Sequence, residues 1–388
     1  MSNNNKTPAI RFKGFTDTWE QRKLGEISES FEYGLNAAAT EYDGKHKYIR
    51  ITDIDDSTHL FLQDNLTSPD VDFSTVDDYL LQKGDVLFAR TGASVGKTYI
   101  YRPSDGDLYF AGFLIRAKIK SDYDADFIFQ NTLTDNYDSY IRITSQRSGQ
   151  PGVNAQEYAN FALSVPCLAE QKKIGAYFTN LDNLITLHQR KYDKLIQFKA
   201  AMLKKMFPQN GANKPEIRFR GFTDAWEQRK LEEVITVGNG MDYKHLSEGD
   251  IPVYGTGGYM LSVDKALSYD KDAIGIGRKG TIDKPYVLKA PFWTVDTLFY
   301  CIPKEDYSLD FVYCIFQNVN WKEKDESTGV PSLSKVNINS TDVKVPTLAE
   351  QEKIGEYFSK LDSIITLHQR KCDKYKSIKS GLLKKIFP

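Results

Sequence analysis

Residues 168–208, LAEQKKIGAYFTNLDNLITLHQRKYDKLIQFKAAMLKKMFP, decide the architecture because they recur at the end of the chain. The second copy, residues 348–388, is LAEQEKIGEYFSKLDSIITLHQRKCDKYKSIKSGLLKKIFP, and most of its positions are identical to those of the first. A repeat of this kind indicates two copies of one structural unit within the chain.

Apolar residues recur in both copies at steps of three and four, which predicts long helices with the seam of a coiled coil. A helix of about forty residues is about 60 Å long at 1.5 Å per residue, which is more than a compact domain needs. We therefore expect each helix to act as a spacer, and expect the two to pack antiparallel, which would relate the halves of the chain by an approximate two-fold axis. The expected seam residues include Phe178, Leu181, Ile185, His188, Phe358, Leu361, Ile365 and His368.

His188 and His368 occupy equivalent positions near the middle of the two helices. We interpret them as polar seam residues that fix the register of a coiled coil. A metal site is the alternative, but neither histidine has a cysteine or carboxylate at ligand spacing.

Composition places the chain among ordinary globular proteins. It has 388 residues, which predicts two or three domains, with 40% hydrophobic and 27% charged residues. No apolar run approaches a membrane span and the first residues lack a signal-peptide core, so we expect a cytoplasmic protein with no membrane partner. The net charge of -1 argues against wholesale electrostatic binding of nucleic acid but allows local basic grooves. The four cysteines are scattered without CxxC spacing, so we expect them to be reduced and to lie in the core or the seam.

A second repeat precedes each helix. IRFKGFTDTWEQRKLGEI at 10–27 recurs as IRFRGFTDAWEQRKLEEV at 217–234. We call these two segments the boxes. Between each box and its helix lies an insert of different length and sequence, so a fixed frame carries two different inserts. This pattern predicts domains at 1–166 and 209–346, with the long helices at 167–208 and 347–388.

Both inserts show the same order of β-rich segments, a helix and a glycine loop, which predicts two versions of one mixed α/β domain. In the first insert we expect strands at 48–54 and 109–119, strands and turns at 84–102, and one helix at 125–143. Arg90-Thr91-Gly92 matches Arg278-Lys279-Gly280, and Gly149-Gln150-Pro151 matches Gly329-Val330-Pro331.

These matched loops concentrate side chains suited to contacts with base edges and phosphates. Any one of them alone is more typical of a solvated surface, so the prediction rests on their concentration in both inserts. The candidates in the first insert are Arg90, Thr91, Ser94, Lys97, Arg142, Gln146, Arg147, Gln150 and Asn154. Those in the second are Arg278, Lys279, Thr281, Lys284, Ser332, Ser334 and Lys335.

The sequence offers little sign of an active site of its own. GASVGKT at 92–98 is one residue too short between its glycine and the GK pair for a phosphate loop, and a strand-like segment follows it. The five histidines show no HExxH spacing, and no GxSxG elbow occurs. We therefore expect no catalytic, cofactor-binding or metal-binding residues in this chain.

The order box, insert and long helix, twice over, resembles the specificity subunit of Type I restriction-modification enzymes over nearly the whole chain. The residues that carry the resemblance are the two boxes, GDVLFARTGASVGKTYIY at 84–101, GRKGTIDKPYVLKAPFWTVDTLFY at 277–300, and VPCLAEQKKI and VPTLAEQEKI before the helices.

This resemblance implies an α+β fold with two mixed α/β target recognition domains, joined by two long helices packed as an antiparallel coiled coil with internal pseudo-two-fold symmetry. Each domain would recognise half of a split site in double-stranded DNA, and the helices would set the gap. It also implies two methyltransferase subunits and restriction/translocase subunits as partners, which would carry S-adenosylmethionine, ATP and Mg. The absence of any Pro-Pro pair, and hence of an adenine-methylation motif, fits this division of labour.

Two other classes of function stay open at this point. A coiled-coil scaffold would hold partner proteins without recognising bases, but it would not need divergent inserts rich in Arg, Gln and Asn. An enzyme that modifies DNA itself is disfavoured by the missing cofactor motifs.

Overall fold

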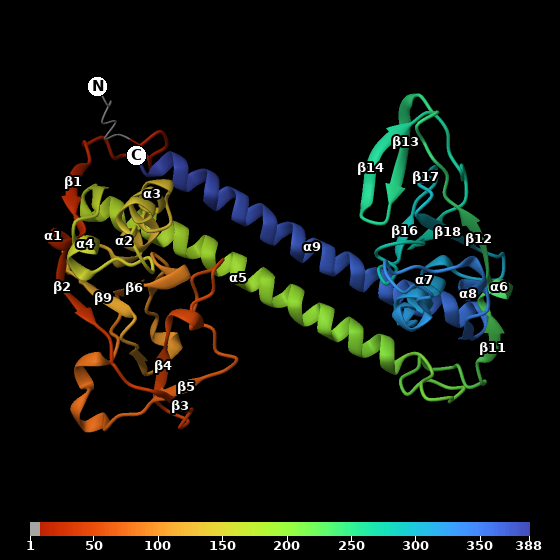
Figure 1. The fold of residues 1–388 in the computed structure, drawn as a ribbon, viewed down its shortest axis with the longest axis horizontal. Coiled ribbons are helices and arrows are strands. Elements are labelled where there is room, and N and C mark those ends of the chain that lie inside the picture. The colour runs from red at the N-terminus through yellow and green to blue at the C-terminus, as the bar shows by residue number, and fades with distance from the viewer. Residues whose placement is uncertain (1–7) are drawn as a thin grey trace. The chain divides into compact units, whose positions relative to one another are not determined.

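The computed structural model describes residues 8–388, which form two compact units (Figure 1). Among the described residues, the first unit comprises 8–189 and Arg370–Pro388, and the second comprises Arg190–Gln369. Both long helices, α5 (Leu168–Lys205) and α9 (Leu348–Ile386), therefore contribute a segment to each unit.

The two long helices confirm the main prediction from the repeat. Each begins two residues after a proline, Pro166 or Pro346, and runs without a break to within a few residues of the expected end. No helix among residues 8–388 is long and apolar enough to cross a membrane.

Within the first unit the α5 and α9 segments run antiparallel. Phe178 of α5 lies beside Phe387, just beyond the end of α9, with their ring centroids 5.9 Å apart. Further along α5, the Ile185 carbonyl lies 3.9 Å from the sulfur of Cys372, which is earlier in α9. Residue numbers rise on one helix as they fall on the other, which confirms the antiparallel prediction for this unit.

The same arrangement occurs inside the second unit. Phe207, which follows α5, lies 6.4 Å from Phe358 between ring centroids, while Lys199 binds Asp362 at 2.5 Å. The expected seam residues Phe178, Leu181, Ile185, His188, Phe358 and Leu361 are buried, whereas Ile365 and His368 are half-buried. His188 stacks on Tyr375 with ring centroids 5.7 Å apart.

Each unit contains a four-stranded antiparallel sheet with the same strand order. In the first unit the order is β2-β9-β6-β7, and in the second it is β12-β18-β15-β16. The bounds are β2 (Ser28–Tyr33), β6 (Asp85–Ala89), β7 (Thr98–Ile100), β9 (Leu114–Ile119), β12 (Ile235–Asn239), β15 (Ala273–Gly277), β16 (Tyr286–Leu288) and β18 (Leu298–Pro303). The shared order confirms that the inserts are two versions of one mixed α/β domain.

The additional strands differ between the units. The first has the pairs β3–β5 and β4–β8, whereas the second has a three-stranded sheet of order β14-β13-β17. Their bounds are β3 (Ala39–Glu41), β4 (Lys47–Ile49), β5 (Thr67–Pro69), β8 (Leu108–Phe110), β13 (Glu248–Gly255), β14 (Gly258–Val263) and β17 (Trp293–Thr294). The frame is thus repeated while its extensions are not.

The boxes tie each insert to its long helix. β1 (Glu20–Lys23) pairs antiparallel with β10 (Ala162–Val165), and β11 (Glu227–Lys230) pairs in the same way with β19 (Asp342–Val345). Short helices α1 (Leu24–Ile27) and α6 (Leu231–Val234) follow the first strand of each pair. Each box therefore closes its insert directly before the long helix begins.

Matched ion pairs fix the boxes to the helices. Arg11 donates to both carboxylate oxygens of Glu170 at 2.7 and 2.8 Å, and Arg218 donates to both oxygens of Glu350 at 2.7 Å. Both glutamates lie in the first turn of a long helix and are fully buried. A bidentate arginine satisfies a carboxylate that water cannot reach.

Three expected elements of the first insert are wrong in detail. Residues 125–143 form two helices, α2 (Ala125–Asn131) and α3 (Asp135–Thr144), because Thr134 caps α3 through its hydroxyl and interrupts the chain. The strand expected at 109–119 is divided between β8 and β9 by a turn at Gly112. The strand expected at 48–54 ends at Ile49 and continues as a 3₁₀ turn.

The remaining helices are α4 (Ala155–Ala159), α7 (Leu309–Asn318) and α8 (Lys335–Asn339), and α7 confirms the helix expected in the second insert. The four cysteines are free. Cys301, Cys314 and Cys372 are buried as expected, but Cys167 is exposed, which corrects its assignment to the core or seam.

Candidate nucleic-acid interface

The structure brings the two loops singled out in the first insert together. Thr91 forms an antiparallel bridge with Gly152, the amide of Gly92 donates to the Pro151 carbonyl at 3.0 Å, and the amide of Val153 donates to the Arg90 carbonyl at 2.9 Å. The glycine loop is thereby paired with the end of β6.

The second unit repeats this pairing bond for bond. Lys279 forms an antiparallel bridge with Ser332, the amide of Gly280 donates to the Pro331 carbonyl at 2.9 Å, and the amide of Leu333 donates to the Arg278 carbonyl at 2.9 Å. We call the paired loops of each unit its loop pair, residues 90–94 with 146–154 and residues 278–284 with 329–335. All these bonds join main-chain atoms, so the side chains are free to differ between the units.

The side chains of the first loop pair have different surroundings. Arg90 is half-buried, with its guanidinium 4.9 Å from the centroid of the Tyr33 ring and its Nη1 3.4 Å from the Gly112 carbonyl. Thr91 and Ser94 are half-buried, while Gln146 and Gln150 are exposed.

Two predicted contact residues cap helices. The Asn154 side chain accepts from the Glu157 amide at 2.9 Å at the start of α4, and the Ser334 hydroxyl accepts from the Asn337 amide at 3.1 Å at the start of α8. A helix cap accounts for the sequence preference at both positions. Asn154 and Ser334 therefore stabilise the start of the helix that follows each loop pair.

Arg147 is engaged within the protein. Its guanidinium donates to both carboxylate oxygens of Glu157 at 2.6 Å, and its Nη1 donates to the carbonyls of Thr144 and Gln146. These bonds fasten the glycine loop to α4, so we expect Arg147 to position the loop.

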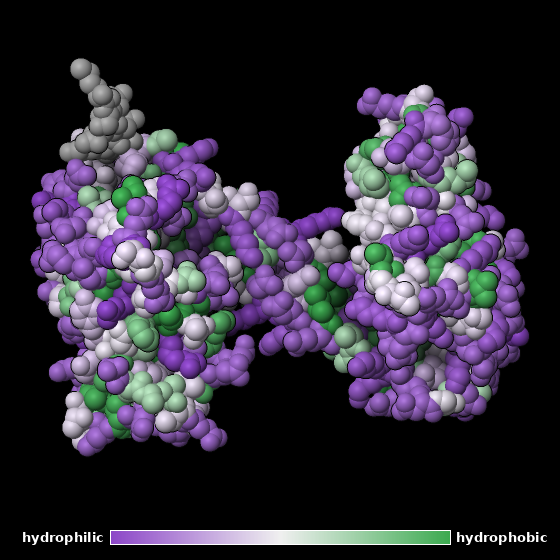
Figure 2. All heavy atoms as spheres, in the orientation of Figure 1, coloured by the Kyte–Doolittle hydropathy of each residue, from purple (hydrophilic) through white to green (hydrophobic). Residues whose placement is uncertain are grey.

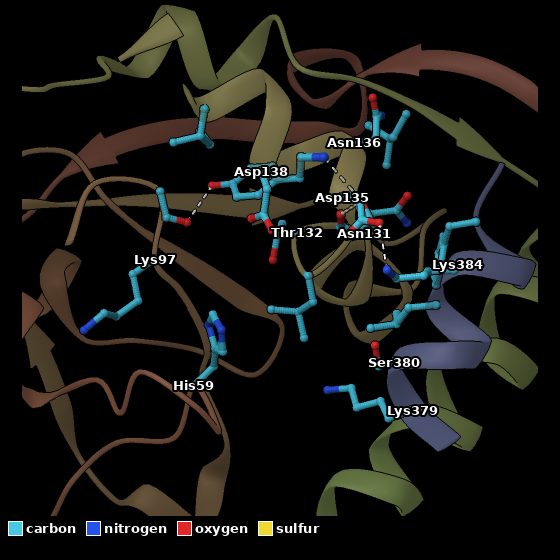
Figure 3. A pocket seen from close by; sticks show the side chains of 18 of the residues that line it. His59, Lys97, Asn131, Thr132, Asp135, Asn136, Asp138, Lys379, Ser380 and Lys384 are labelled. Atoms are coloured by element: carbon cyan, nitrogen blue, oxygen red, sulfur yellow. Dashed lines mark hydrogen bonds and ion pairs between the residues drawn. The ribbon is translucent and has the colours of Figure 1, made fainter. Parts of the chain in front are cut away.

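Lys97 and Arg142 line a cleft of about 1300 Å³ in the first unit (Figure 3). Lys97 donates to the Ile54 carbonyl at 3.0 Å and forms an ion pair with Asp56. On the opposite side, Lys379 and Lys384 extend from α9.

Several of the charges that line this cleft lie in ion pairs. Lys379 binds Asp182 at 2.6 Å, and Lys384 lies 3.3 Å from Asp135 of α3. Each of these pairs weakens the electrostatic attraction that its lysine would exert on a phosphate.

His59 sits in the same cleft with its Nδ1 2.8 Å from the Thr98 carbonyl. Burial lowers the pKa of His59, and the positive charges of Lys379 and Lys97 lower it further, against the opposing effect of the Thr98 carbonyl. The imidazole is therefore held in its neutral form more firmly than a free histidine.

The second loop pair presents more cations to solvent. Arg278, Lys279, Lys284 and Lys335 are exposed, and Thr281 and Ser332 are half-buried. The backbone amides of Ser332 and Ser327 donate to Asp325 at 2.9 Å and hold the pKa of its carboxyl below the usual range. Asp325 thus fastens this glycine loop, as Arg147 fastens the first one.

Sequence reasoning missed several exposed side chains beside the loop pairs. In the first unit Tyr33 and Phe113 contact Arg90. In the second unit Asn239 is paired with Phe299, which lies near Arg278, and Asp296 precedes Thr297, whose carbonyl accepts from the Arg278 amide. All four are exposed. Aromatic residues usually pack in the core, so residue type alone gave no signal that Tyr33 and Phe113 are exposed. Figure 2 shows that hydrophobic residues on the visible face form small patches in a largely hydrophilic surface.

No cluster of three or more metal-ligating side chains occurs among residues 8–388. The segment GASVGKT forms a 3₁₀ turn, Gly92–Ser94, followed by β7, so its glycines do not lead into the helix N-terminus that a phosphate loop requires.

Comparison with known proteins places this geometry in a family. The family described as Type I restriction modification DNA specificity domain matches residues 16–197 and again residues 223–375, which together make up most of the chain. The two matches contain the two loop pairs.

Curated relatives agree with this match. The chain is 21% identical over 410 aligned positions to the Type I restriction enzyme MjaVIII specificity subunit of Methanocaldococcus jannaschii, covering 95% of this chain and 91% of the relative. It is 26% identical to a putative Type I restriction enzyme MjaX specificity subunit of the same organism, over 49% of this chain and 46% of the relative.

A solved structure supports the fold. The crystal structure of the Type-I restriction-modification system S subunit from M. genitalium matches with a TM-score of 0.76 and 16% identity, covering 98% of this chain and 99% of that one. With the double family match and the repeated frame, the chain belongs to the family of Type I restriction-modification specificity subunits.

Proposed function

We propose that this chain recognises a bipartite site in double-stranded DNA, with one half-site for each unit. The observation that carries the proposal is the loop pair, built from the same main-chain hydrogen bonds in both units but furnished with different side chains. A constant backbone with variable side chains suits the recognition of two unlike base sequences, because base edges are distinguished by side-chain donors, acceptors and apolar groups.

Within this proposal the recognition domains are residues 1–166 and 209–346, and residues 167–208 and 347–388 are spacers that set the gap between half-sites. The exposed Arg278, Lys279, Gln150 and Gln146 are the leading candidates for contacts with DNA. Asn154, Ser334 and Arg147 have structural tasks and would act mainly by positioning the loops.

We further propose that the chain is not itself an enzyme. Two methyltransferase subunits would dock on the repeated frame, and restriction/translocase subunits would join them, all in the cytoplasm. S-adenosylmethionine, ATP and Mg would bind to these partners. The net charge of -1 predicts weak DNA binding by the isolated chain and tighter binding by the complex.

Exchange of residues 28–165 for the corresponding insert of another specificity subunit tests the proposal. Long-read mapping of methylated adenines should show that one half of the motif changes and the other half is retained. The reciprocal exchange of residues 235–345 should change the other half. A motif that survives both exchanges would contradict base recognition and favour the scaffold function.

A further inference from the structure

The two loop pairs can be aligned residue by residue through their hydrogen bonds. The Arg90 amide donates to the Phe113 carbonyl at 3.0 Å, and the Arg278 amide donates to the Thr297 carbonyl at 2.8 Å. Phe113 and Thr297 are therefore equivalent, and so are their neighbours Gly112 and Asp296.

A second equivalence lies at the ends of β2 and β12. Tyr33 is opposite Ile115 in the first sheet, and Asn239 is opposite Phe299 in the second. The glycines that follow donate their amides in the same way, Gly34 to Leu114 and Gly240 to Leu298. We call the positions of Tyr33, Gly112 and Phe113, with Asn239, Asp296 and Thr297 as their counterparts, the rim.

The rim of the first unit is aromatic and holds its arginine. The Arg90 guanidinium lies over Tyr33, whose hydroxyl accepts from the Ala155 amide at 3.2 Å. A guanidinium has five N–H donors, and one of those on Arg90 points to the Gly112 carbonyl. The other donors of Arg90 are left for a base, while the contacts with Tyr33 and Gly112 fix the plane of the guanidinium. Tyr33 thus orients Arg90 before DNA arrives.

In the second unit a different aromatic ring lies beside the arginine. Its arginine, Arg278, lies 5.8 Å from the ring centroid of Phe299, a buried side chain of β18. The equivalent of Phe299 in the first sheet is Ile115, which has no ring to stack on. The rim positions in this unit carry the exposed polar residues Asn239 and Asp296.

Phe113 differs from Tyr33, the other aromatic residue of this rim, because no cation–π contact to Arg90 is found for its ring among residues 8–388. Phe113 is 59% exposed, and its carbonyl accepts from the Arg90 amide. Solvent-exposed phenylalanine next to a positioned guanidinium is suited to the major groove, where an apolar side chain contacts the C5-methyl group of thymine.

We propose that Phe113 contacts a thymine methyl group in the half-site of the first unit, beside the base that Arg90 contacts, and that Tyr33 positions Arg90 for this contact. The inference rests on the proposed recognition of DNA by each unit. The polar rim of the second unit, by contrast, recognises its half-site through hydrogen bonds that Asn239 donates or accepts and that Asp296 accepts.

Deoxyuridine provides the test, because it removes only the methyl group of thymine. In the complex with the methyltransferase partners, each thymine of the first half-site is replaced in turn and the Kd is measured. One replacement should weaken wild-type binding about fourfold, which corresponds to the roughly 0.8 kcal/mol of one buried methyl group. The Phe113→Ala variant should bind thymine and deoxyuridine at that position equally well.

Two control variants separate this contact from general damage. Thr297→Ala should keep the full deoxyuridine penalty in the first half-site, since it alters the rim of the other unit. Tyr33→Phe keeps the ring and should retain affinity, whereas Tyr33→Ala should relax the base preference next to the thymine.

The outcomes distinguish this inference from the proposed function. If exchange of residues 28–165 changes one half of the motif but every deoxyuridine substitution is neutral, or that half contains no thymine on either strand, the role of Phe113 is refuted and DNA recognition stands. A penalty that persists in Phe113→Ala also refutes it. If the exchange leaves the motif unchanged, recognition itself is refuted.

Discussion

The carboxylate of Asp182 on α5 accepts from the ammonium group of Lys379 on α9 at 2.6 Å, inside the first unit. Its other oxygen accepts from Gln130 Nε2 of α2 at 2.9 Å, so one side chain joins three helices. The second unit repeats the ion pair between Asp362 and Lys199.

Replacement of Lys379 by Met should destabilise the first unit. Both side chains of the pair are mostly shielded from water, and a hydrogen bond to a charged group contributes about 1.5–3 kcal/mol. Urea unfolding should show a loss of that size. Lys384→Met is the control, since Lys384 and its partner Asp135 are both exposed and such pairs are worth under about 1 kcal/mol. Equal losses in the two variants would contradict the assignment.

Arg11→Ala should have a larger effect because it leaves the fully buried Glu170 without its partner. Removal of one member of a buried ion pair costs about 3–5 kcal/mol. Hydrogen exchange should locate the loss at the start of α5, and Arg218→Ala should give the same result at the start of α9. The exposed pair Arg22–Glu20 is the control, and an equally large effect from Arg22→Ala would speak against burial as the cause.

The first unit should lose stability as the pH falls from about 7.5 to 5. Burial lowers the pKa of His59 below the value of about 6.5 for an unfolded chain, so the unfolded state takes up a proton first and is favoured as acid is added. His59→Asn should flatten the dependence of Tm on pH, because Asn tolerates the positive φ of 56° at this position. NMR titration of His59 checks the sign, and a pKa at or above 6.5 would contradict it.

Arg90→Ala or Arg278→Ala should relax the methylated motif at one position of one half-site. A bidentate contact to a base is worth about 1–3 kcal/mol of discrimination. Adenine-methylation mapping shows which position of the motif is relaxed, and Kd measurements on matched and mismatched duplexes give the loss of discrimination. A uniform loss of affinity on every sequence would instead identify the arginine as a phosphate contact.

Insertion of one heptad into each long helix, after Lys191 and after Lys371, should lengthen the gap in the motif. Seven residues add about 10 Å at 1.5 Å per residue while preserving the seam. This length corresponds to about three base pairs of DNA, at 3.4 Å each. Mapping of the motif measures the gap, and an unaltered gap would show that the helices do not set it.

The frame was predictable because its signals are local or repeated. The stripe through Phe178 and Phe358 and the duplicated sequence predicted both helices and their direction. The pairing of β1 with β10 could not be predicted, because two strands some 140 residues apart leave no periodic signal that they pair. The break at Thr134 was missed because the apolar residues on both sides fit one helix, whereas the hydroxyl cap decides otherwise.

The candidate interface was predicted at the level of loops but not of side chains. Matching Arg90 with Arg278 found the two loop pairs, whose partnership follows from shared main-chain bonds. Composition could not show that Asn154 caps a helix, that Arg147 forms an ion pair with Glu157, or that Phe113 faces solvent. These roles depend on neighbours that only the folded chain supplies.

The main-chain bonding of the loop pairs bears on how specificity can evolve. Since the sheets and loops are held by amides and carbonyls, substitutions at exposed positions such as Phe113 and Asn239 disturb few contacts on which folding depends. New target sequences can then be explored by point mutation at little risk to the fold. The duplicated chain allows one half to drift in this way while the other keeps its target.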